Sequence, residues 1–123
     1  DSIVRGTTLI KIVAMLRSAG AREVHIRISS PPSTGSCYYG VDTPNKEELI
    51  AYRHSTDEIR DIMGADSLGY LSLEGLRGLA AQELKIGICD GCFSGVYPVP
   101  VNSEEELPQL SLFRAVEDDP DLD

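Results

Sequence analysis

A helical pattern followed at once by an alternating strand pattern constrains the fold of this chain more than any other feature. Residues 7–19 place apolar side chains at helical spacing and end before a glycine. Residues 23–29 then alternate polar and apolar side chains, so that the apolar ones share one face. A helix that leads directly into such a strand predicts a β-α-β unit, and we expect its first strand to precede Asp1. The predicted fold class is therefore α/β.

The rest of the sequence predicts short helices, one more strand and an irregular C-terminal segment. Ser55 followed three residues later by Glu58 is a capping box, which marks the start of a helix. Ser72 can cap a later helix, which two internal glycines weaken by about 1 kcal/mol each. The expected elements are a loop over 31–40, a helix from residue 43, a helix over 56–63, a buried strand over 68–71, a helix over 73–82 and irregular structure from residue 85.

The charge and hydropathy of the chain exclude two classes of partner. Its 123 residues make about one domain, and their net charge of −9 leaves no basic surface for nucleic acid. No apolar run approaches the roughly 18 residues of a membrane helix. Residues 1–20 show no signal-peptide pattern, so we expect a cytoplasmic protein without membrane contact. Residues 117–123 form an acidic run, which is typical of a solvated tail.

Residues 1–8, with the sequence DSIVRGTT, stand directly before the first predicted helix and have the chemistry of an anion-binding loop. Backbone N–H groups at a helix N-terminus converge on one point and favour negative charge. Gly6 lets the backbone approach a ligand closely, and the hydroxyls of Thr7 and Thr8 add donors. Asp1 can accept hydrogen bonds from ribose hydroxyls. An alternative from the residues alone is that Thr7 serves only as a helix cap.

The chain has three cysteines, and two of them, Cys89 and Cys92, are separated by two residues. This spacing suits zinc, an iron–sulfur cluster or a redox pair. A redox pair is disfavoured, because the motif is not expected to open a helix after a strand. Cysteine-only sites need four ligands, and Cys37 supplies only a third. His25 and His54 have no evident reason to be the fourth ligand, and unligated buried thiols remain an alternative.

The order of residues in 1–8 resembles the phosphoribosyl pyrophosphate signature of type I phosphoribosyltransferases, in which two acidic residues end a strand before the loop. Asp1 corresponds to the second of those acidic residues. The chain is more specifically similar to the amidophosphoribosyltransferase family, from Asp1 to about Pro98. Leu9 and Ile10 depart from the polar pair that is usual in the family. The similar segments follow the family's order and are 1–8, 19–32, 37–51, 63–76 and 89–98.

This resemblance implies the domain organisation and the roles of the loop residues. Residues 1–82 would be the C-terminal part of a type I phosphoribosyltransferase domain, incomplete at its N-terminus, with a Rossmann-like parallel sheet and flanking helices. Residues 83–123 would be a helical, irregular, cysteine-bearing segment with an acidic tail. Asp1 would bind the ribose 2′- and 3′-hydroxyls and meet Mg²⁺ through the substrate. The 5′-phosphate would be held by Arg5, Gly6, Thr7 and Thr8, in a loop shaped by Ser2, Ile3 and Val4.

The same resemblance implies a role for the cysteines and a reaction. Cys37, Cys89 and Cys92 would be ligands of a 4Fe–4S cluster whose fourth ligand lies outside this chain, because family members without the cluster replace these cysteines. The whole enzyme makes 5-phosphoribosylamine from phosphoribosyl pyrophosphate and glutamine, the first step of de novo purine biosynthesis. It would bind inhibitory purine nucleotides, pack against the rest of the same polypeptide and form a homo-oligomer. We expect the 123 residues alone to be inactive. The alternative is a non-catalytic nucleotide-binding or scaffold module derived from the family.

Overall fold

The computed structural model describes residues 2–100, so Asp1 and the acidic residues 117–123 lie outside the described part of the chain. The helix expected over 7–19 and the strand expected within 23–29 are both confirmed. In chain order the elements are α1 (Thr7–Ser18), β1 (His25–Ile28), η1 (Lys46–Glu48), α2 (Ile50–Arg53), α3 (Thr56–Met63), β2 (Ser67–Tyr70), α4 (Leu73–Leu79), η2 (Ala80–Leu84) and α5 (Gly91–Ser94).

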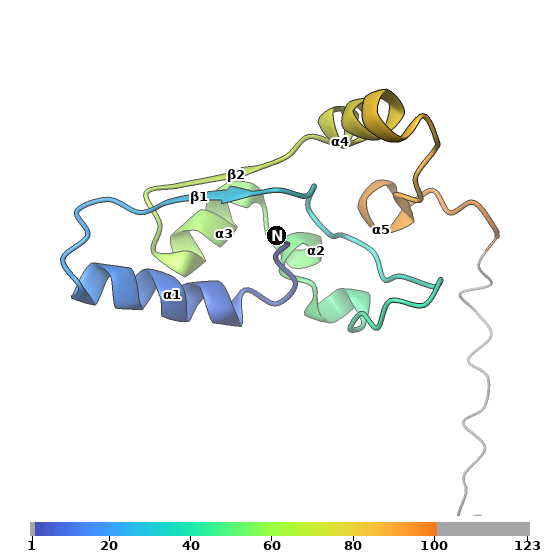
Figure 1. Ribbon diagram of the computed structural model, residues 1–123. Helices are drawn as coiled ribbons and strands as arrows, with labels where there is room; N and C mark the ends of the chain where they lie inside the picture. The colour runs from blue at the N-terminus through green and yellow to red at the C-terminus, as the bar shows by residue number, and fades with distance from the viewer. Residues whose placement is uncertain (1, 101–123) are drawn as a thin grey trace, which may run out of the picture.

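A parallel pair of strands lies at the centre of the described residues, which confirms the α/β prediction. His25 in β1 pairs with Ser67 in β2, and Ile28 pairs with Tyr70. The crossover between the strands runs through η1, α2 and α3. Helix α1 runs back along the strands, so its N-terminus lies on the side of their carboxyl ends (Figure 1). In open α/β sheets this is the side on which ligands bind.

The hydrophobic core lies between the strands and the helices α1 and α3, which pack against each other below the sheet in Figure 1. The alternation predicted for residues 23–29 is confirmed, because its three aliphatic side chains are all buried and the polar side chains between them are exposed. The core is formed by Ile3, Val13, Val24, Ile26, Ile28, Ile50, Ile59 and Met63.

The short helix α3 forms as the capping box predicts. The Ser55 hydroxyl accepts a hydrogen bond from the Glu58 N–H, and the Glu58 carboxylate accepts one from the Ser55 N–H at 2.7 Å. Gly64 ends the helix in the left-handed conformation, at φ 68°. Ile59 and Met63 on its inner face are only 1% and 2% exposed. Local capping and core packing therefore specify the same helix.

The boundaries of three other predicted elements need correction. The helix expected from residue 43 begins only at Lys46, as a 3₁₀ turn, and the extended backbone of Leu49 separates it from α2. Leu49 leaves the helical path because its side chain, 1% exposed, turns into the interior. The helix expected over 73–82 is α-helical only to Leu79 and then widens into the π-helical turn η2. Strand β2 is half-buried rather than buried, since all four of its residues are partly exposed.

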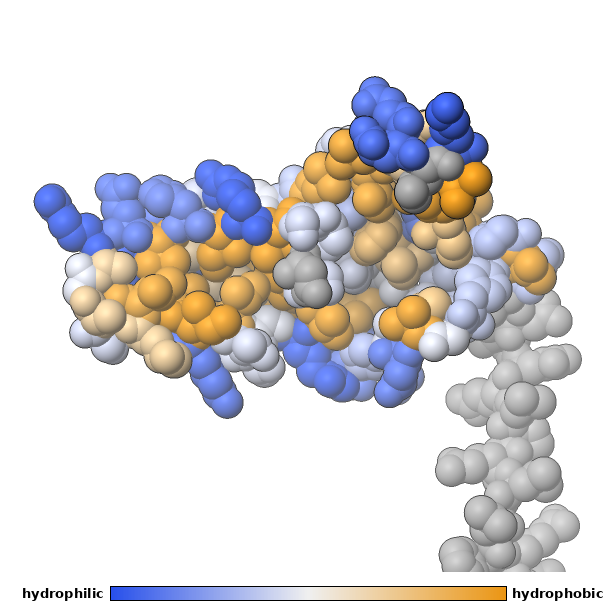
Figure 2. All heavy atoms as spheres, viewed as in Figure 1, coloured by the Kyte–Doolittle hydropathy of each residue, from blue (hydrophilic) through white to orange (hydrophobic). Residues whose placement is uncertain are grey.

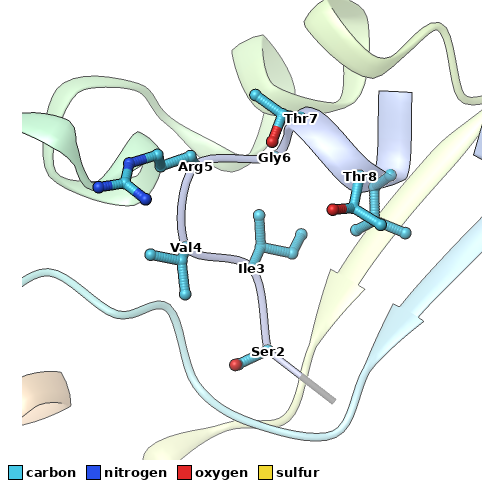
Figure 3. Close-up of a pocket in the computed structure, with 8 residues that line it drawn as sticks. Ser2, Ile3, Val4, Arg5, Gly6, Thr7 and Thr8 are labelled. Atoms are coloured by element: carbon cyan, nitrogen blue, oxygen red, sulfur yellow. The ribbon is translucent and has the colours of Figure 1, made fainter. Parts of the chain in front are cut away.

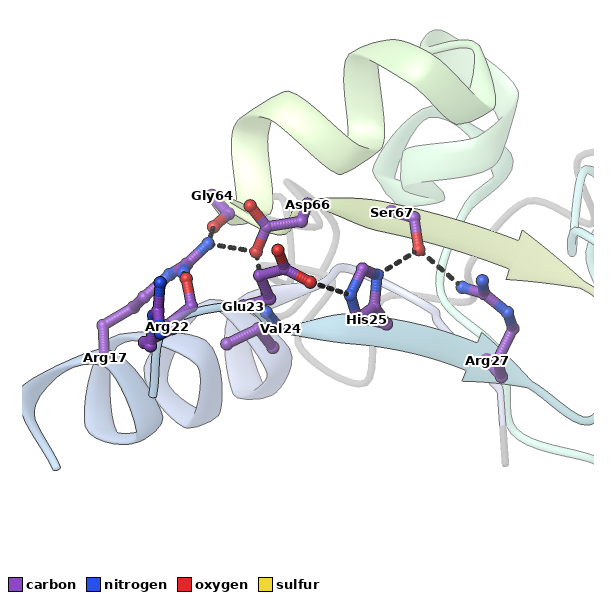
Figure 4. Close-up of polar contacts among 9 residues, drawn as sticks. All are labelled: Arg17, Arg22, Glu23, Val24, His25, Arg27, Gly64, Asp66 and Ser67. Carbon is purple, nitrogen blue, oxygen red and sulfur yellow. Dashed lines mark hydrogen bonds and ion pairs between the residues drawn. The ribbon is translucent and has the colours of Figure 1, made fainter. Parts of the chain in front are cut away.

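A polar network around Asp66 fastens the end of α1 to the start of both strands (Figure 4). The Asp66 carboxylate accepts a hydrogen bond from the Val24 N–H at 2.7 Å and pairs with Arg17 of α1. Arg17 also donates to the carbonyls of Arg22 and Gly64. The Val24 N–H above all, together with the Arg17 guanidinium, lowers the pKa of Asp66.

Much of the apolar surface of α1 stays uncovered, although its apolar residues have helical spacing. Val13 alone among the residues of α1 is buried, while Met15 is 70% exposed and Leu16 is 44% exposed. Figure 2 shows hydrophobic side chains at the surface along α1 and near α4. Among residues 2–100, no helix is long and apolar enough to cross a membrane.

Candidate phosphate-binding loop and cysteine cavity

The segment before α1 surrounds a pocket of about 260 Å³, which is lined by residues 2–9 (Figure 3). Ile3 anchors this segment in the core and is 3% exposed. Thr7 and Thr8 are exposed at the first turn of α1. The structure therefore gathers the seven predicted loop residues that it describes, Ser2 to Thr8, around one pocket, while Asp1 lies outside the described residues.

Gly6 sets the direction in which the chain enters α1. It is the N-cap of the helix and has a left-handed backbone, with φ 79° and ψ −9°, which favours glycine. A Cβ atom at this position would lie 3.1 Å from the Ile50 Cδ1 atom and 3.1 Å from the Met63 Cε atom. Both the backbone conformation and the close packing therefore call for glycine. Thr7 is the first residue of the helix and not its cap, so the simple capping alternative is wrong.

The N-terminus of α1, as far as the structure describes the loop, has no side-chain cap for its first hydrogen-bond donors. The first helical bond runs from the Ile10 N–H to the Gly6 carbonyl, so the N–H groups of residues 7–9 have no partner within the helix. Gly6 has no side chain with which to cap them. Helices α3 and α4, in contrast, are capped by the hydroxyls of Ser55 and Ser72. The α1 N-terminus thus has the open donors and the positive field that an anion needs.

Arg5 has a partner that the sequence did not reveal. Its Nε and Nη2 atoms contact the Glu48 Oε2 atom at 2.9 and 2.7 Å. The Ile50 N–H donates to the Val4 carbonyl at 2.9 Å, so η1 and α2 support the back of the loop. From the sequence, Glu48 belongs only to the helix expected from residue 43. Since it is 43 residues from Arg5, no local pattern could have identified the pair.

The three cysteines line one cavity of about 650 Å³, which also borders Ser2, Val4 and Arg5 of the phosphate loop. The two segments that hold them are tied together. The N–H groups of Thr34 and Gly35 both donate to the Cys92 carbonyl at 3.0 Å, and the Tyr97 hydroxyl donates to the Ser36 carbonyl at 2.7 Å. The structure therefore places Cys37 and the Cys89–Cys92 pair around the same cavity.

The environment of Cys92 disfavours the thiolate form of its side chain. Burial raises the pKa of Cys92, and the neighbouring Cys37, Cys89 and Asp90 raise it further. Asp90 is itself fixed by Arg77 of α4, whose Nε atom lies 2.6 Å from Asp90 Oδ2. A short helix, α5, does begin between the two cysteines, but it follows a loop and not a strand.

The arrangement of donors limits what the cysteine cavity could hold. Within the described part of the chain, no three His, Cys, Asp or Glu side chains are placed so that they could hold a metal ion. A 4Fe–4S cluster differs from a single ion, since each cysteine binds a separate iron and the cluster fills space between the sulfurs.

His25 lies on the open face of the sheet, where it contacts Ser67 Oγ and Glu23 Oε2 at 2.9 and 3.0 Å (Figure 4).

Known proteins similar to this chain come from one family, although no family model matches it. Amidophosphoribosyltransferase 2 of Arabidopsis thaliana, a chloroplast protein by name, is 59% identical over 99 residues, which are 80% of this chain and 18% of that protein. Amidophosphoribosyltransferase of Bacillus subtilis is 51% identical over 113 residues, 89% of this chain and 24% of the relative. The chain thus spans about a fifth to a quarter of the length of these relatives.

A solved structure agrees with these sequence matches. The glutamine phosphoribosylpyrophosphate amidotransferase of B. subtilis, complexed with ADP and GMP, superposes with a TM-score of 0.75 at 51% identity and covers 84% of this chain and 23% of that one. The parallel strands with flanking helices are accordingly part of a type I phosphoribosyltransferase fold. By sequence and by fold, the chain belongs to the amidophosphoribosyltransferase family.

Proposed function

We propose that this chain is the ribose-5-phosphate-binding part of an amidophosphoribosyltransferase. That enzyme makes 5-phosphoribosylamine, glutamate and pyrophosphate from phosphoribosyl pyrophosphate, glutamine and water, as the first step of purine biosynthesis. The observation that supports the proposal most strongly is the N-terminus of α1, where Gly6 provides no side-chain cap for the N–H groups of residues 7–9 beside a pocket. A similar solved protein was complexed with ADP and GMP, which both contain a 5′-phosphorylated ribose.

In this proposal the first turn of α1 and Asp1 have separate tasks. The N–H groups of residues 7–9 and the hydroxyls of Thr7 and Thr8 bind the 5′-phosphate, which is stabilised by the positive end of the α1 dipole. Asp1 accepts hydrogen bonds from the ribose 2′- and 3′-hydroxyls, and Mg²⁺ reaches it only through the substrate. Positioning is the main contribution of such a site, because a correctly held ribose lets ammonia displace pyrophosphate directly.

A pair of threonines that occupy equivalent positions gives a direct test of this binding site. Thr7 and Thr56 are the first residues of α1 and α3, and both are exposed, but only Thr7 borders the pocket. A hydrogen bond to a charged group contributes about 1.5–3 kcal/mol, so Thr7→Val should weaken ribose 5-phosphate binding by roughly tenfold or more. Thr56→Val should leave binding unchanged. Calorimetric titrations that give the same affinity for both variants would refute the proposed site.

We also propose that Cys37, Cys89 and Cys92 are three ligands of a 4Fe–4S cluster whose fourth ligand lies outside this chain. Support comes from the shared cavity of about 650 Å³ and from the hydrogen bonds that tie the Cys37 loop to Cys92. When bound, the cluster would serve as a structural crosslink between these segments. Iron and sulfide analysis of anaerobically purified protein should find about four of each per chain. Cys92→Ser should lose them, whereas Ser94→Ala in the same helix should keep them, and bound zinc would contradict the assignment.

The remaining expectations rest on the same family assignment. We propose that purine nucleotides inhibit the whole enzyme by competing at residues 1–8, and that the whole enzyme is a homo-oligomer. The cytoplasmic location stays a prediction, because a relative named as a chloroplast protein shares 59% of the aligned residues. Residues 1–123 alone should form no phosphoribosylamine, and measurable product from that polypeptide would contradict this expectation.

A further inference from the structure

We propose that Glu48 is a positioning residue of the phosphate site, whose carboxylate holds the Arg5 guanidinium and competes for it with the bound phosphate. This inference rests on the proposed phosphate-binding function of residues 2–8. It differs from that proposal because it concerns a residue of η1, far from the loop in sequence, and because it makes the role of Arg5 conditional on the state of Glu48.

The geometry of the pair defines what Glu48 does to Arg5. Both contacts, from Nε at 2.9 Å and from Nη2 at 2.7 Å, end on the same carboxylate oxygen, Oε2. Figure 3 shows the Arg5 side chain directed away from Thr7 and Thr8 and toward the neighbouring helical segment. In this arrangement two donors of the guanidinium face a protein carboxylate, while Thr7 and Thr8 line the pocket.

The backbone around Glu48 holds its carboxylate near the loop. Leu49, the next residue, is 1% exposed, and the following Ile50 N–H donates to the Val4 carbonyl at 2.9 Å. These contacts fix residues 48–50 beside residues 4–6, so that Glu48 cannot move far from Arg5. Glu47 is also exposed and belongs to the same 3₁₀ turn, but its carboxylate makes no ion pair with Arg5.

Because the Arg5–Glu48 pair is exposed, Arg5 can exchange the Glu48 carboxylate for a phosphate at little cost in free energy. The Arg5 and Glu48 side chains are 53% and 47% exposed, so water and salt screen their attraction. An exposed ion pair contributes so little free energy that breaking it changes an equilibrium constant by no more than about fivefold. A phosphate presents more charge and more acceptor oxygens than one carboxylate, and a guanidinium binds it in the same two-donor geometry. Arg5 can therefore leave Glu48 for a phosphate in the pocket that Arg5 itself borders.

A double-mutant cycle in the whole polypeptide that carries this chain tests the exchange. Calorimetry would measure the affinity for ribose 5-phosphate and for inorganic phosphate in the wild type, Glu48→Gln, Arg5→Ala and the double variant, at two salt concentrations. Release of Arg5 in Glu48→Gln should tighten binding by up to about fivefold and make it more sensitive to salt. In the Arg5→Ala background the same substitution should have no effect. Glu47→Gln controls for the general loss of one negative charge beside an anion site.

The possible outcomes separate this inference from the function on which it rests. If the wild type binds neither ligand, the proposed function fails and the inference fails with it. If the wild type binds but Glu48→Gln has the same effect with and without Arg5, the inference alone is overturned. Equal gains in Glu47→Gln and Glu48→Gln would overturn it as well. Circular dichroism of each variant, and a Glu48→Asp variant that restores the carboxylate, show whether a loss of binding reflects misfolding.

Discussion

The replacement of Gly6 by alanine tests the reasoning about the phosphate loop most directly. Gly6 has φ 79°, and an alanine in the left-handed region costs about 1–2 kcal/mol. The added Cβ would also lie 3.1 Å from Ile50 Cδ1 and from Met63 Cε. Both atoms end flexible side chains, so we expect them to move by a few tenths of an ångström, at an additional cost of about 1 kcal/mol. The total predicted loss of stability is about 2–3 kcal/mol.

Gly64 provides a matched control for this substitution. It also has a left-handed backbone, at φ 68°, but a Cβ there would meet nothing within 4 Å. Gly64→Ala should therefore show the conformational cost alone, about 1–2 kcal/mol. Urea denaturation with linear extrapolation gives both free energies of unfolding, provided that the slopes stay equal. Titration with ribose 5-phosphate then shows whether only Gly6→Ala also loses binding.

Two results would refute this account of the loop. If Gly6→Ala is no less stable than Gly64→Ala, the contact with Ile50 and Met63 does not constrain the loop. If Gly6→Ala keeps its full affinity for ribose 5-phosphate, the direction of the α1 N–H groups does not depend on this backbone conformation. The second result would remove the main structural support for the phosphate site.

Three further predictions concern the parts of the fold that hold the site. The Val24 N–H lowers the pKa of Asp66, so the ionised Asp66 stabilises the fold fully above the ordinary aspartate pKa of about 4, and this stabilisation is lost as the pH falls below that value. Asp66→Asn should therefore make the free energy of unfolding depend less on pH in this range. Urea denaturation at several pH values measures the difference. Gly91→Ala would place a Cβ 2.5 Å from the Tyr97 ring, so hydrogen exchange should show loosening confined to the cysteine segments. Ser55→Ala should lower stability by about 1 kcal/mol, through the lost cap of α3, and should not change phosphate binding.

Local signals in the sequence predicted the elements whose cause is local. The capping box of Ser55 and Glu58 specified α3 because both partners lie within one turn, and the alternation over 23–29 specified β1 because one face of that strand is buried. The predictions were wrong where the interior decides the backbone. Leu49 interrupts a helical pattern because burying its side chain outweighs one more turn of a short, exposed helix.

The sequence predicted only part of the candidate site. The rest depends on contacts between residues that are far apart in the chain. The donors of the phosphate loop belong to consecutive residues, so their type and order could be read from 2–8. The Arg5–Glu48 pair and the tie between Gly35 and Cys92 join residues that are far apart in the chain. Contacts of this kind depend on the crossover between β1 and β2, which no local pattern describes.

The comparison of α1 with α3 shows why the motif alone could not distinguish a binding loop from an ordinary cap. Both helices begin with an exposed threonine, but α3 satisfies its own N-terminus through Ser55, whereas α1 is preceded by Gly6. Ile50 and Met63, whose side chains lie in the core, leave little room for a Cβ atom at this position. Residues 7–9 thus supply the donors, and Ile50 of α2 and Met63 of α3 restrict the backbone at Gly6 that sets their direction. A phosphate site here is therefore a property of the whole β1–β2 crossover, and a substitution in its core should change ligand affinity without touching the loop.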